Sequence, residues 1–531
     1  MKKLLVIILC LTLTAACLAS CGGSGAEESK TESAAAASTA EPASVTETVS
    51  ETEPVSEEPP VDPVQAILDN PDIYKGDAYQ GRTFKVLTFG VNDTALSEFV
   101  YNEDTTEEAM PETVNLAIKT RNDKVYDALG VTVTEEYYKA NPRFGGPSIK
   151  KVTEIIAEGN PDYSLLSICL YDCGTLAMDN YLWNLNELDN FNPENPWWEQ
   201  YFNESVEIAN QLYFTIGDVG INNKGSTPCV YYNTRLISDL GLDDPLKIAE
   251  EGKWTIDKAL TYARTMPHEE LPAKEQYLQT FGWAGQNDDM YAMLYGSGTR
   301  ILSPDPDGFP MLTLNTETAQ DTVNQVLELM GDSSYVSGND LFSVTTWPMT
   351  LLQKAFEEGR CLFYSGNVDT AVQLNMEDTF GILPVAKLTE EQEQYYSLIN
   401  TWTTNAYCIA TNLDKEGAEF AAAVFDVMGY YSWSMYPDSL AFNYYEKMLK
   451  SQKLTREDCE KMLDRIFEAR GCELGAIFQI GKTTGSTSVN EMLVKLIEAK
   501  GTMSFVSTYQ TYESAFEADV DAIKEYFTAD K

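Results

Sequence analysis

Three short apolar segments, separated by two helix-forming segments, decide the fold class of this chain. They are TFKVLTF at residues 83–89, VTVT at residues 131–134 and SLLSI at residues 164–168. Apolar residues recur at helical spacing over 114–129, and a second helical pattern covers 149–157. The order strand, helix, strand, helix, strand is typical of an α/β layer, in which helices cover both faces of a mostly parallel sheet.

A second group of strands and helices follows the first. Thr255 stands where the N-cap of a helix is expected, before apolar residues at helical spacing. Roughly the last hundred residues have a helical pattern. The part that can fold begins near Val64, and about 465 residues are too many for one hydrophobic core, so we expect two lobes. Further strands are predicted at 228–232, 279–283, 361–364, 380–384 and 406–410.

The amino terminus predicts export. Lys2 and Lys3 precede an apolar stretch at residues 4–19, which is short for a membrane span but typical of a secretory signal. Leu18-Ala19-Ser20-Cys21 resembles the bacterial lipobox, which implies cleavage after residue 20 and a lipid on Cys21. We therefore expect a signal peptide at 1–20 and a protein anchored on the extracellular face of the cell membrane. The alternative is an ordinary signal peptide with a chance cysteine.

The segment that follows Cys21 is expected to be a tether. Residues 21–63 consist mainly of Ala, Ser, Thr, Glu and Pro, with scarcely any large apolar side chain. Such a segment cannot bury a core and is predicted to be disordered and acidic. No second apolar stretch is long enough for a transmembrane helix, so the lipid is the expected link to the membrane.

Composition excludes several function classes. The chain has 531 residues and a formal net charge of -45, which repels phosphate backbones and makes nucleic acid an unsuitable partner. It has one histidine, His268, so histidine-rich metal sites and histidine-dependent triads are not expected. Seven cysteines follow Cys21, and this odd number without paired spacing favours buried free thiols, with a Cys169–Cys173 pair left open. We predict no cofactor and no metal.

Several motifs occur in an order that resembles one protein family. Residues 214–265 contain Gly217-Asp218, then VYYN at 230–233, LGL at 240–242 and GKWT at 252–255. This order resembles the extracellular solute-binding lipoproteins of Gram-positive ABC importers, in the group that handles sugars. Together the matches run from about Arg82 to about Met428. Other matching stretches are PDY at 161–163, NYLWNL at 180–185, GRCLF at 359–363 and FGILP at 380–384.

The resemblance implies a fold and a mechanism. The fold is the two-lobed type II periplasmic-binding arrangement, with a hinge and a helical carboxyl-terminal part. By the order of motifs, lobe 1 comprises 64–227 with 388–428, and lobe 2 comprises 228–387 with 429–531. The resemblance implies that a solute, a carbohydrate or oligosaccharide, bridges the lobes and favours the closed form, which a permease recognises. The resemblance thus implies a monomeric binding protein that breaks no bond.

Candidate ligand residues follow from the rule that open α/β sheets bind ligands at the carboxyl ends of their strands. Aromatic rings suit the C–H faces of sugars, and amides or carboxylates suit their hydroxyl groups. Trp402 precedes a predicted strand and is included for its chemistry alone. The candidates are Tyr171, Asp172, Asp218, Trp283, Gln286, Asn287, Gly366, Asn367 and Trp402.

Two other functions remain open from the sequence. One is a surface-anchored glycoside hydrolase, because 82 acidic residues always permit a pair of carboxylates at a suitable separation. The other is a sensory or adhesive binding protein that serves no transporter. Cleavage of an oligosaccharide would identify the hydrolase, and neighbouring permease genes would favour the importer.

Overall fold

A computed structural model describes most of the chain after the predicted tether. All described residues belong to the unit Val61–Lys531. The signal peptide at 1–20, the lipid anchor Cys21 and nearly all of the tether at 21–63 lie outside the described residues and stay predictions. The described ranges are 62–70, 77–90, 96–106, 110–454 and 457–529.

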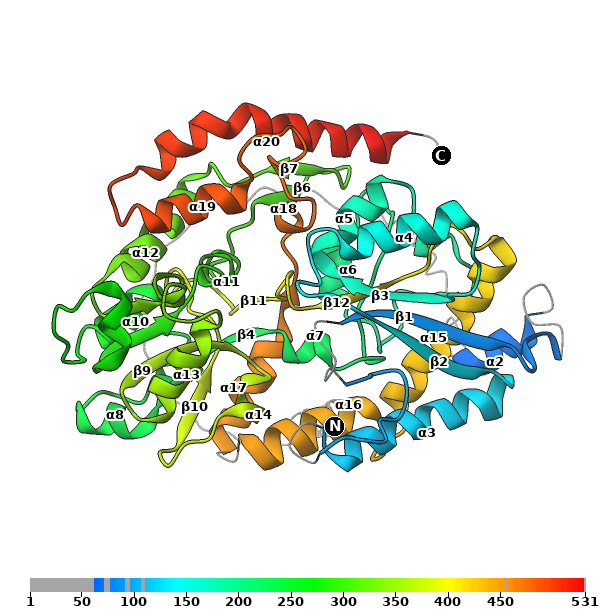
Figure 1. Cartoon of the computed structure of the whole chain (residues 1–531), viewed down its shortest axis with the longest axis horizontal. Helices are drawn as coiled ribbons and strands as arrows, with labels where there is room; N and C mark the ends of the chain where they lie inside the picture. The colour runs from blue at the N-terminus through cyan, green and yellow to red at the C-terminus, as the bar shows by residue number, and fades with distance from the viewer. Residues whose placement is uncertain (1–61, 71–76, 91–95, 107–109, 455–456, 530–531) are drawn as a thin grey trace, which may run out of the picture. The chain divides into compact units, whose positions relative to one another are not determined.

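The first sheet, which defines lobe 1, confirms the predicted strand–helix alternation. It has four strands in the order β12-β3-β1-β2, in which β1, β2 and β3 are parallel and β12 is antiparallel to β3. Helices α4 and α5 lie on one side of this sheet and α3 and α15 on the other (Figure 1). The bounds are β1 Thr83–Gly90, β2 Thr132–Lys139, β3 Leu165–Cys169, β12 Asn405–Cys408, α3 Glu112–Leu129, α4 Pro147–Glu158, α5 Leu170–Met178 and α15 Lys415–Ser434.

Burial explains why the apolar runs become the central strands. Phe84, Val86 and Phe89 of β1 are fully buried, as are the neighbouring residues of β3, because both faces of these strands are covered. Strand β2 lies at the edge of the sheet and is only partly buried, which allows polar residues in its second half. The predicted strand at 131–134 is therefore too short, because it rests on the apolar residues alone. Gly130 ends α3 with φ 69°, a left-handed conformation that glycine adopts without strain.

The second sheet, which defines lobe 2, has five strands in the order β10-β4-β9-β5-β8. Strand β4 is antiparallel to both of its neighbours, whereas β9, β5 and β8 are parallel. Helices α10, α12 and α13 pack against this sheet. The bounds are β4 Pro228–Asn233, β5 Phe281–Gly285, β8 Tyr335–Ser337, β9 Cys361–Asn367, β10 Phe380–Leu383, α10 Ile256–Ala263, α12 Glu317–Gly331 and α13 Pro348–Glu357.

Several predicted details of lobe 2 are confirmed, and several short strands are missed. The Thr255 hydroxyl accepts a hydrogen bond from the Lys258 amide, as an N-cap should. The predicted strand at 279–283 begins two residues later, at Phe281. The missed strands have two or three residues each, which is too short for an alternating pattern to emerge. They are β6 Leu302–Pro304, β7 Pro310–Leu312, β8, β11 Ser397–Leu398 and β13 Arg470–Gly471.

The chain passes between the two sheets in three stretches. The first, residues 217–227, includes α7 (Asn222–Gly225), and the second, residues 384–404, includes β11. The two stretches lie side by side, since the Asn400 amide donates to the Ser226 carbonyl oxygen at 3.2 Å. The third lies between α15 and α17 (Glu457–Glu468), because α15 packs on α3 in lobe 1 and α17 packs on β10 in lobe 2. The exact lobe boundaries remain predictions.

Arg470 links the crossing segments through its backbone and its side chain. Strand β13 pairs in parallel with β11, which brings the carboxyl-terminal part of the chain to the crossing region. The buried Arg470 guanidinium donates to the Asn223 carbonyl oxygen at 3.0 Å and to the Thr227 hydroxyl at 3.1 Å. It also pairs with the Glu199 carboxylate. The guanidinium thus joins the first crossing to Glu199 of lobe 1, and the backbone of the same residue pairs with β11 of the second crossing.

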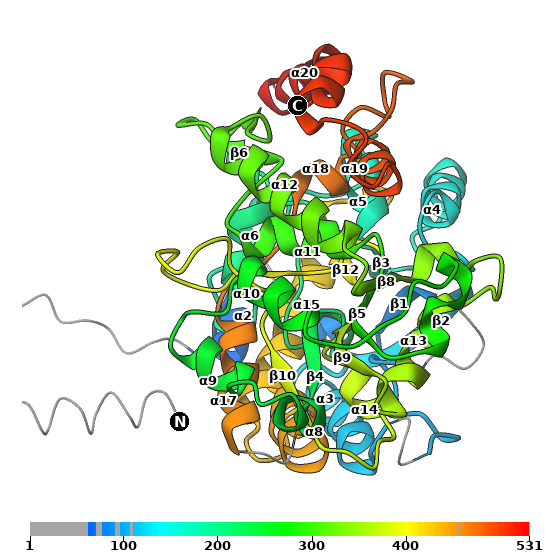
Figure 2. The ribbon, with the colours of Figure 1, turned by 90° about the vertical axis from the view of Figure 1, so that its left-hand side faces the viewer.

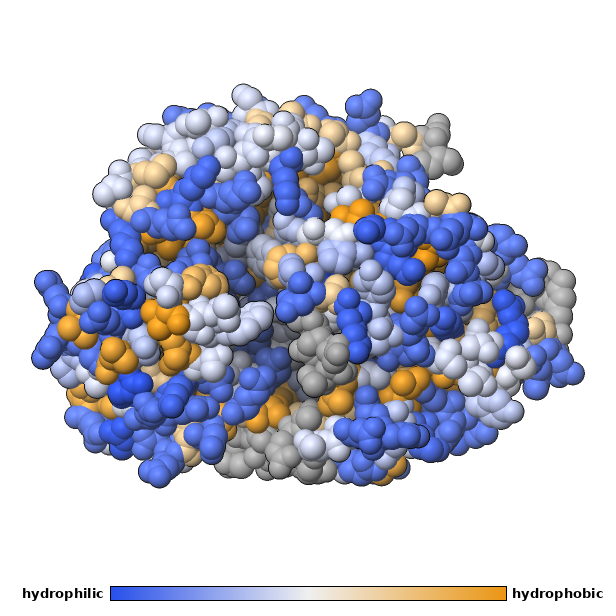
Figure 3. All heavy atoms as spheres, viewed as in Figure 1, coloured by the Kyte–Doolittle hydropathy of each residue, from blue (hydrophilic) through white to orange (hydrophobic). Residues whose placement is uncertain are grey.

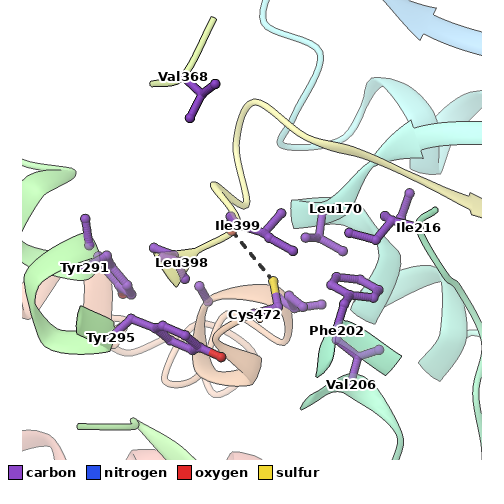
Figure 4. Packing of buried hydrophobic residues seen from close by; sticks show 14 of the residues in the cluster. Leu170, Phe202, Val206, Ile216, Tyr291, Tyr295, Val368, Leu398, Ile399 and Cys472 are labelled. Carbon is purple, nitrogen blue, oxygen red and sulfur yellow. Dashed lines mark hydrogen bonds between the residues drawn. The ribbon is translucent and has the colours of Figure 1, made fainter. Parts of the chain in front are cut away.

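The second crossing is also packed on both sides by apolar side chains. Figure 4 shows Leu398 and Ile399 between aromatic residues of lobe 2, Tyr291 and Tyr295, and a group from lobe 1 that includes Leu170. The Cys472 thiol donates to the Ile399 carbonyl oxygen at 3.8 Å. The hydrophobic core is therefore continuous through the crossing region.

The carboxyl-terminal part is largely helical, as predicted. Helices α19 (Val489–Glu498) and α20 (Phe505–Thr528) pack on each other and on α12 (Figures 1 and 2). Within the described residues, no helix is both long and apolar enough to span a membrane. The remaining elements are α2 Pro63–Asp69, η1 Asp77–Tyr79, η2 Leu185–Glu187, α6 Gln200–Val206, α8 Thr234–Asp239, α9 Pro245–Glu250, η3 Ala273–Leu278, α11 Asp289–Gly296, η4 Gly338–Leu341, α14 Thr370–Gln373, α16 Leu440–Phe442, η5 Asn443–Lys453 and α18 Leu474–Ile477.

The predicted free thiols are confirmed. All seven cysteines of the described residues are buried and none of them forms a disulfide, Cys169 and Cys173 included. Burial raises the pKa of the Cys169 thiol to about 11 and that of Cys472 to about 12. These thiols therefore stay protonated and act as small apolar side chains.

Candidate functional site

Two neighbouring cavities lie where the strands of the two sheets end. The first, which we call the Trp402 cavity, has a volume of about 180 Å³ and lies at the carboxyl ends of β5 and β9. The second, the Asn405 cavity, has a volume of about 520 Å³ and lies at the carboxyl ends of β1, β2 and β3. The molecular face in Figure 3 is largely hydrophilic and is hollowed near its centre.

The turn after β9 connects the two cavities. Gly366, Asn367 and Thr370 line the Trp402 cavity, and Asp369 and Gln373 line the Asn405 cavity. The crossing stretches line both cavities, because residues of the second crossing line the Trp402 cavity and residues of the first line the Asn405 cavity. The two cavities therefore form one candidate groove at the strand ends of both sheets, where α/β folds bind ligands.

Trp402 presents the largest aromatic surface in the Trp402 cavity. Its partly exposed ring packs on Tyr171 at 5.9 Å between centroids with an angle of 31°, and edge-on to Tyr291 at 5.3 Å. The Trp402 amide donates to the Asn400 side-chain oxygen at 3.0 Å, which orients the segment. The indole N–H has no hydrogen-bond partner among the described residues. The ring is thus held in place from behind, and its N–H is available to a ligand.

Amide side chains accompany this ring. Gln286, Asn367 and Asn400 line the same cavity, and the Asn367 side chain makes no hydrogen bond to the residues that the structure describes. Gly366 lets the backbone pack closely against the start of α14, because a Cβ there would stand 2.9 Å from the Thr370 hydroxyl. Four predicted site residues, Gln286, Gly366, Asn367 and Trp402, therefore line one cavity, and Tyr171 supports it from behind.

The other predicted residues lie elsewhere. Trp283 is fully buried, and its indole N–H donates to the Ser365 hydroxyl at 2.9 Å, so its ring belongs to the core of lobe 2. Asp172 is fully buried too, because it accepts hydrogen bonds from Gly145 and Ser148 at the start of α4, where the helix dipole favours a carboxylate. These two placements correct the expectation of ligand contact.

Asp218 and Asn287 do not line the two groove cavities either. The Asp218 carboxylate pairs with the Lys224 ammonium at 2.6 Å, and neither residue lines the two groove cavities. Asn287 lines a separate cavity of about 220 Å³, and its amide donates to the Asn339 side chain at 3.0 Å. For Asn287 the strand-end rule identifies the correct edge but not the direction of the side chain, whereas Asp218 follows an isolated β-bridge at Thr215 and not a strand.

The groove is also lined by carboxyl groups that the sequence analysis did not identify. Burial raises the pKa of Asp288 to about 6 and the pKa of Asp289 to about 7 in the Trp402 cavity. Burial likewise raises the pKa of Glu98 to about 7 and that of Asp369 to about 6 in the Asn405 cavity. Among the described residues that line this second cavity, Arg143 is the one cation. The groove is therefore acidic.

A polar network surrounds the Asn405 cavity. The Glu98 carboxylate accepts from the Ile221 amide at 3.1 Å and from the Asn222 amide, so it holds the first crossing. The Asn405 side-chain N–H donates to the Phe89 carbonyl oxygen at 3.1 Å, while its side-chain oxygen has no partner among the described residues. Tyr137 and Tyr444 contribute aromatic surface. This cavity could accommodate hydroxyl-rich groups next to those in the Trp402 cavity.

Adjacency in sequence could have identified some of the missed residues. Asp288 and Asp289 directly follow Gln286 and Asn287, which the strand-end rule selects. Arg143 and Tyr444 come from a loop and from η5, which carry no such signal. Within the described ranges, no group of three or more His, Cys, Asp or Glu side chains could hold a metal ion.

Comparison with solved structures places this arrangement in a known fold. An ABC substrate-binding protein from Listeria monocytogenes, in complex with cycloalternan, superposes with a TM-score of 0.50 at 13% identity. The match covers 85% of this chain and 100% of that one. The chain has the fold of ABC substrate-binding proteins. The predicted two-lobed α/β fold is confirmed.

Two further solved structures are similar at lower scores. One is the lacto-N-biose-bound galacto-N-biose/lacto-N-biose I-binding protein of an ABC transporter from Bifidobacterium longum, with a TM-score of 0.49, 11% identity, and coverage of 85% of this chain and 98% of that one. The other is a maltose-bound T. maritima protein, with a TM-score of 0.48, 13% identity, and coverage of 84% and 99%. No family model and no curated protein matches the sequence.

Proposed function

We propose that this protein is an extracellular, membrane-anchored solute-binding protein that captures a carbohydrate between its lobes and delivers it to an ABC transporter. The observation that carries the proposal is the Trp402 cavity. An aromatic ring, held by Tyr171 from behind, stands on a crossing segment beside amide side chains at the strand ends of lobe 2. Aromatic faces and amides are the groups that sugars require.

The fold supports the proposal that the protein binds a solute without transforming it. A ligand in the groove would contact strand ends of both sheets and the crossing segments between them. Such a ligand has higher affinity for the arrangement in which the lobes lie close together, and it shifts the population toward that arrangement. The Listeria monocytogenes protein of the same fold is described with a bound cycloalternan. We extend a saccharide ligand to this chain as part of the proposal.

Trp402→Ala tests the carbohydrate site. Wild-type protein and variant are titrated with maltose, cycloalternan and chito-oligosaccharides by calorimetry, after a thermal-shift screen has identified those that raise the melting temperature. The variant is expected to bind about 1–3 kcal/mol more weakly, by analogy with aromatic stacking on bases. Trp433, a half-exposed tryptophan outside the groove, supplies the matched control Trp433→Ala, which should bind like wild type. Unchanged affinity of Trp402→Ala would remove this ring from the site.

The same samples test the hydrolase alternative. Carboxyl groups with raised pKa in a groove are also what a glycosidase needs as a general acid, so Asp288 and Asp289 give this alternative a specific basis. Chromatography of the saccharides after prolonged incubation should show no shorter products. Shorter products that wild type forms and Asp289→Asn does not form would favour the hydrolase. Binding without transport by a neighbouring permease would favour the sensory alternative.

Cys21→Ala tests the anchor, which lies outside the described residues. The variant lacks the thiol that a diacylglyceryl group would modify, so the protein should move from the membrane fraction to the culture medium. Cys17→Ala is the matched control, because Cys17 lies within the predicted signal peptide and should leave retention unchanged. Immunoblots of membrane and medium fractions provide the measurement. Retention of Cys21→Ala on the membrane would contradict lipid attachment at this residue.

A further inference from the structure

The Trp402 cavity contains two carboxyl groups and no cation. Asp288 and Asp289 line it, while no Lys or Arg is among the described residues that do so. Asp289 accepts a hydrogen bond from the Tyr335 hydroxyl at 2.8 Å. The Asp288 carboxylate, by contrast, makes no hydrogen bond to the described residues, although it is half-buried at the start of α11. One acidic group in the cavity is therefore without a partner.

Two cations lie near this part of the groove, and neither of them lines the Trp402 cavity. The Lys482 ammonium lies 5.8 Å from the centroid of the Tyr171 ring, which is the ring behind Trp402. Arg143 lines the Asn405 cavity, where it faces Asp369. A neutral ligand could donate hydroxyl hydrogen bonds to Asp288, but it would leave the charge of this carboxylate uncompensated, which is less favourable than an ammonium partner. An anionic ligand would add repulsion.

The Trp402 ring also suits a positively charged ligand group. Its position is fixed by Tyr291, which does not line the cavity and packs edge-on against the ring. The face of a tryptophan ring attracts ammonium groups as well as sugar C–H groups, so Trp402 can serve both parts of an amino sugar. The cavity thus combines an aromatic platform, amides and an unpaired carboxylate.

We propose that the solute is an amine-bearing saccharide, whose ammonium group pairs with the Asp288 carboxylate while its ring packs on Trp402. This inference rests on the proposed function and specifies the class of sugar. The other amides of the cavity, from Gln286, Asn367 and Asn400, would take the hydroxyl groups. The paired ammonium supplies the counter-charge that the protein itself does not place there.

The experiment compares two sugars that differ in one group. Glucosamine oligomers carry free amines, and N-acetylglucosamine oligomers of equal length carry neutral amides. Calorimetry at a pH where the amines are protonated should show the amine form binding about 10–100-fold more tightly, the range for a hydrogen bond to a charged group. Added salt should reduce this preference, because it screens the charge pair.

Two variants separate the contribution of Asp288 from the overall charge. Asp288→Asn keeps the shape and should lose about 10–100-fold in affinity for glucosamine oligomers while binding the acetylated oligomers as before. Asp257→Asn makes the same change of charge at an exposed residue of α10, and its affinities should equal those of wild type. Equal loss in both variants would overturn the pairing at Asp288.

The outcomes also separate this inference from the proposed function. If the acetylated oligomers or a neutral glucan bind as tightly as the amine form, the proposal that the ligand bears an amine is wrong. The proposal that the protein captures a saccharide is then unaffected. If no saccharide of either kind binds, the proposed function fails together with the inference.

Discussion

Asp426→Ala is expected to lower the free energy of unfolding by about 3–5 kcal/mol. The Asp426 carboxyl group, on α15, is buried and accepts hydrogen bonds from three donors of one loop. The donors are the indole N–H groups of Trp197 at 3.1 Å and Trp198 at 2.9 Å, and the Asn195 side chain at 3.0 Å. Alanine leaves all three buried N–H groups without an acceptor.

The effect should extend to the fold of lobe 1 because this loop is tightly packed. The Trp198 ring lies 4.5 Å from Phe425, and a Cβ at Gly429 would stand 2.2 Å from the Trp197 ring, so the loop and α15 are in close contact. Urea unfolding followed by tryptophan fluorescence measures the loss. Asp438→Ala, at an exposed position after the same helix, is the control and should stay within about 0.5 kcal/mol of wild type. A loss of under about 1 kcal/mol for Asp426→Ala would show that the two indoles find other partners.

Acidification from about pH 7.5 to about pH 5 is expected to raise the melting temperature. Burial raises the folded-state pKa of Glu98, Asp289 and Asp426 to about 7 and that of Asp288 and Asp369 to about 6. Each value lies above the ordinary value of an unfolded carboxyl group, near 4. Between the two values the folded state binds more protons than the unfolded state, so stability falls as the pH rises through the folded-state pKa.

Calorimetric scans at a series of pH values and constant ionic strength give the measurement. Repeating the series at high salt screens the repulsion among surface charges of a chain with net charge -45 and isolates the contribution of the buried groups. Asp426→Asn removes one of these titrating groups and should flatten the profile. A melting temperature that falls steadily as the pH is lowered from about 7.5 to about 5 would mean that the buried carboxyl groups stay ionised in the folded protein.

The fold of lobe 1 could be predicted because its signals are local. Phe84 to Phe89 and Leu165 to Ile168 form apolar runs since their strands are covered on both faces, and Gly130 marks the end of α3 by its own conformational preference. The short strands β11 and β13 carry no such pattern. They form because the chain passes between lobes there and Arg470 brings its neighbours together, which depends on residues far away in sequence.

The site was predictable only in part, for a related reason. The strand-end rule selects an edge of a sheet, and Gln286, Gly366 and Asn367 do line the cavity at that edge. It does not determine which way a side chain points. Trp283 lies within β5, where both faces are covered, and Asp172 turns toward the start of α4, so both are buried away from the groove.

By itself, the sequence determines the α/β alternation of lobe 1 and the acidic character of the chain, because hydrophobic periodicity and charge are properties of neighbouring residues. The lipid anchor at Cys21 stays a prediction from a short motif. The tertiary structure alone decides that Trp402 packs on Tyr171 and shares a cavity with Asp288 and Asn367. These residues come from crossings and strand ends of different parts of the chain, and only folding brings them to one place.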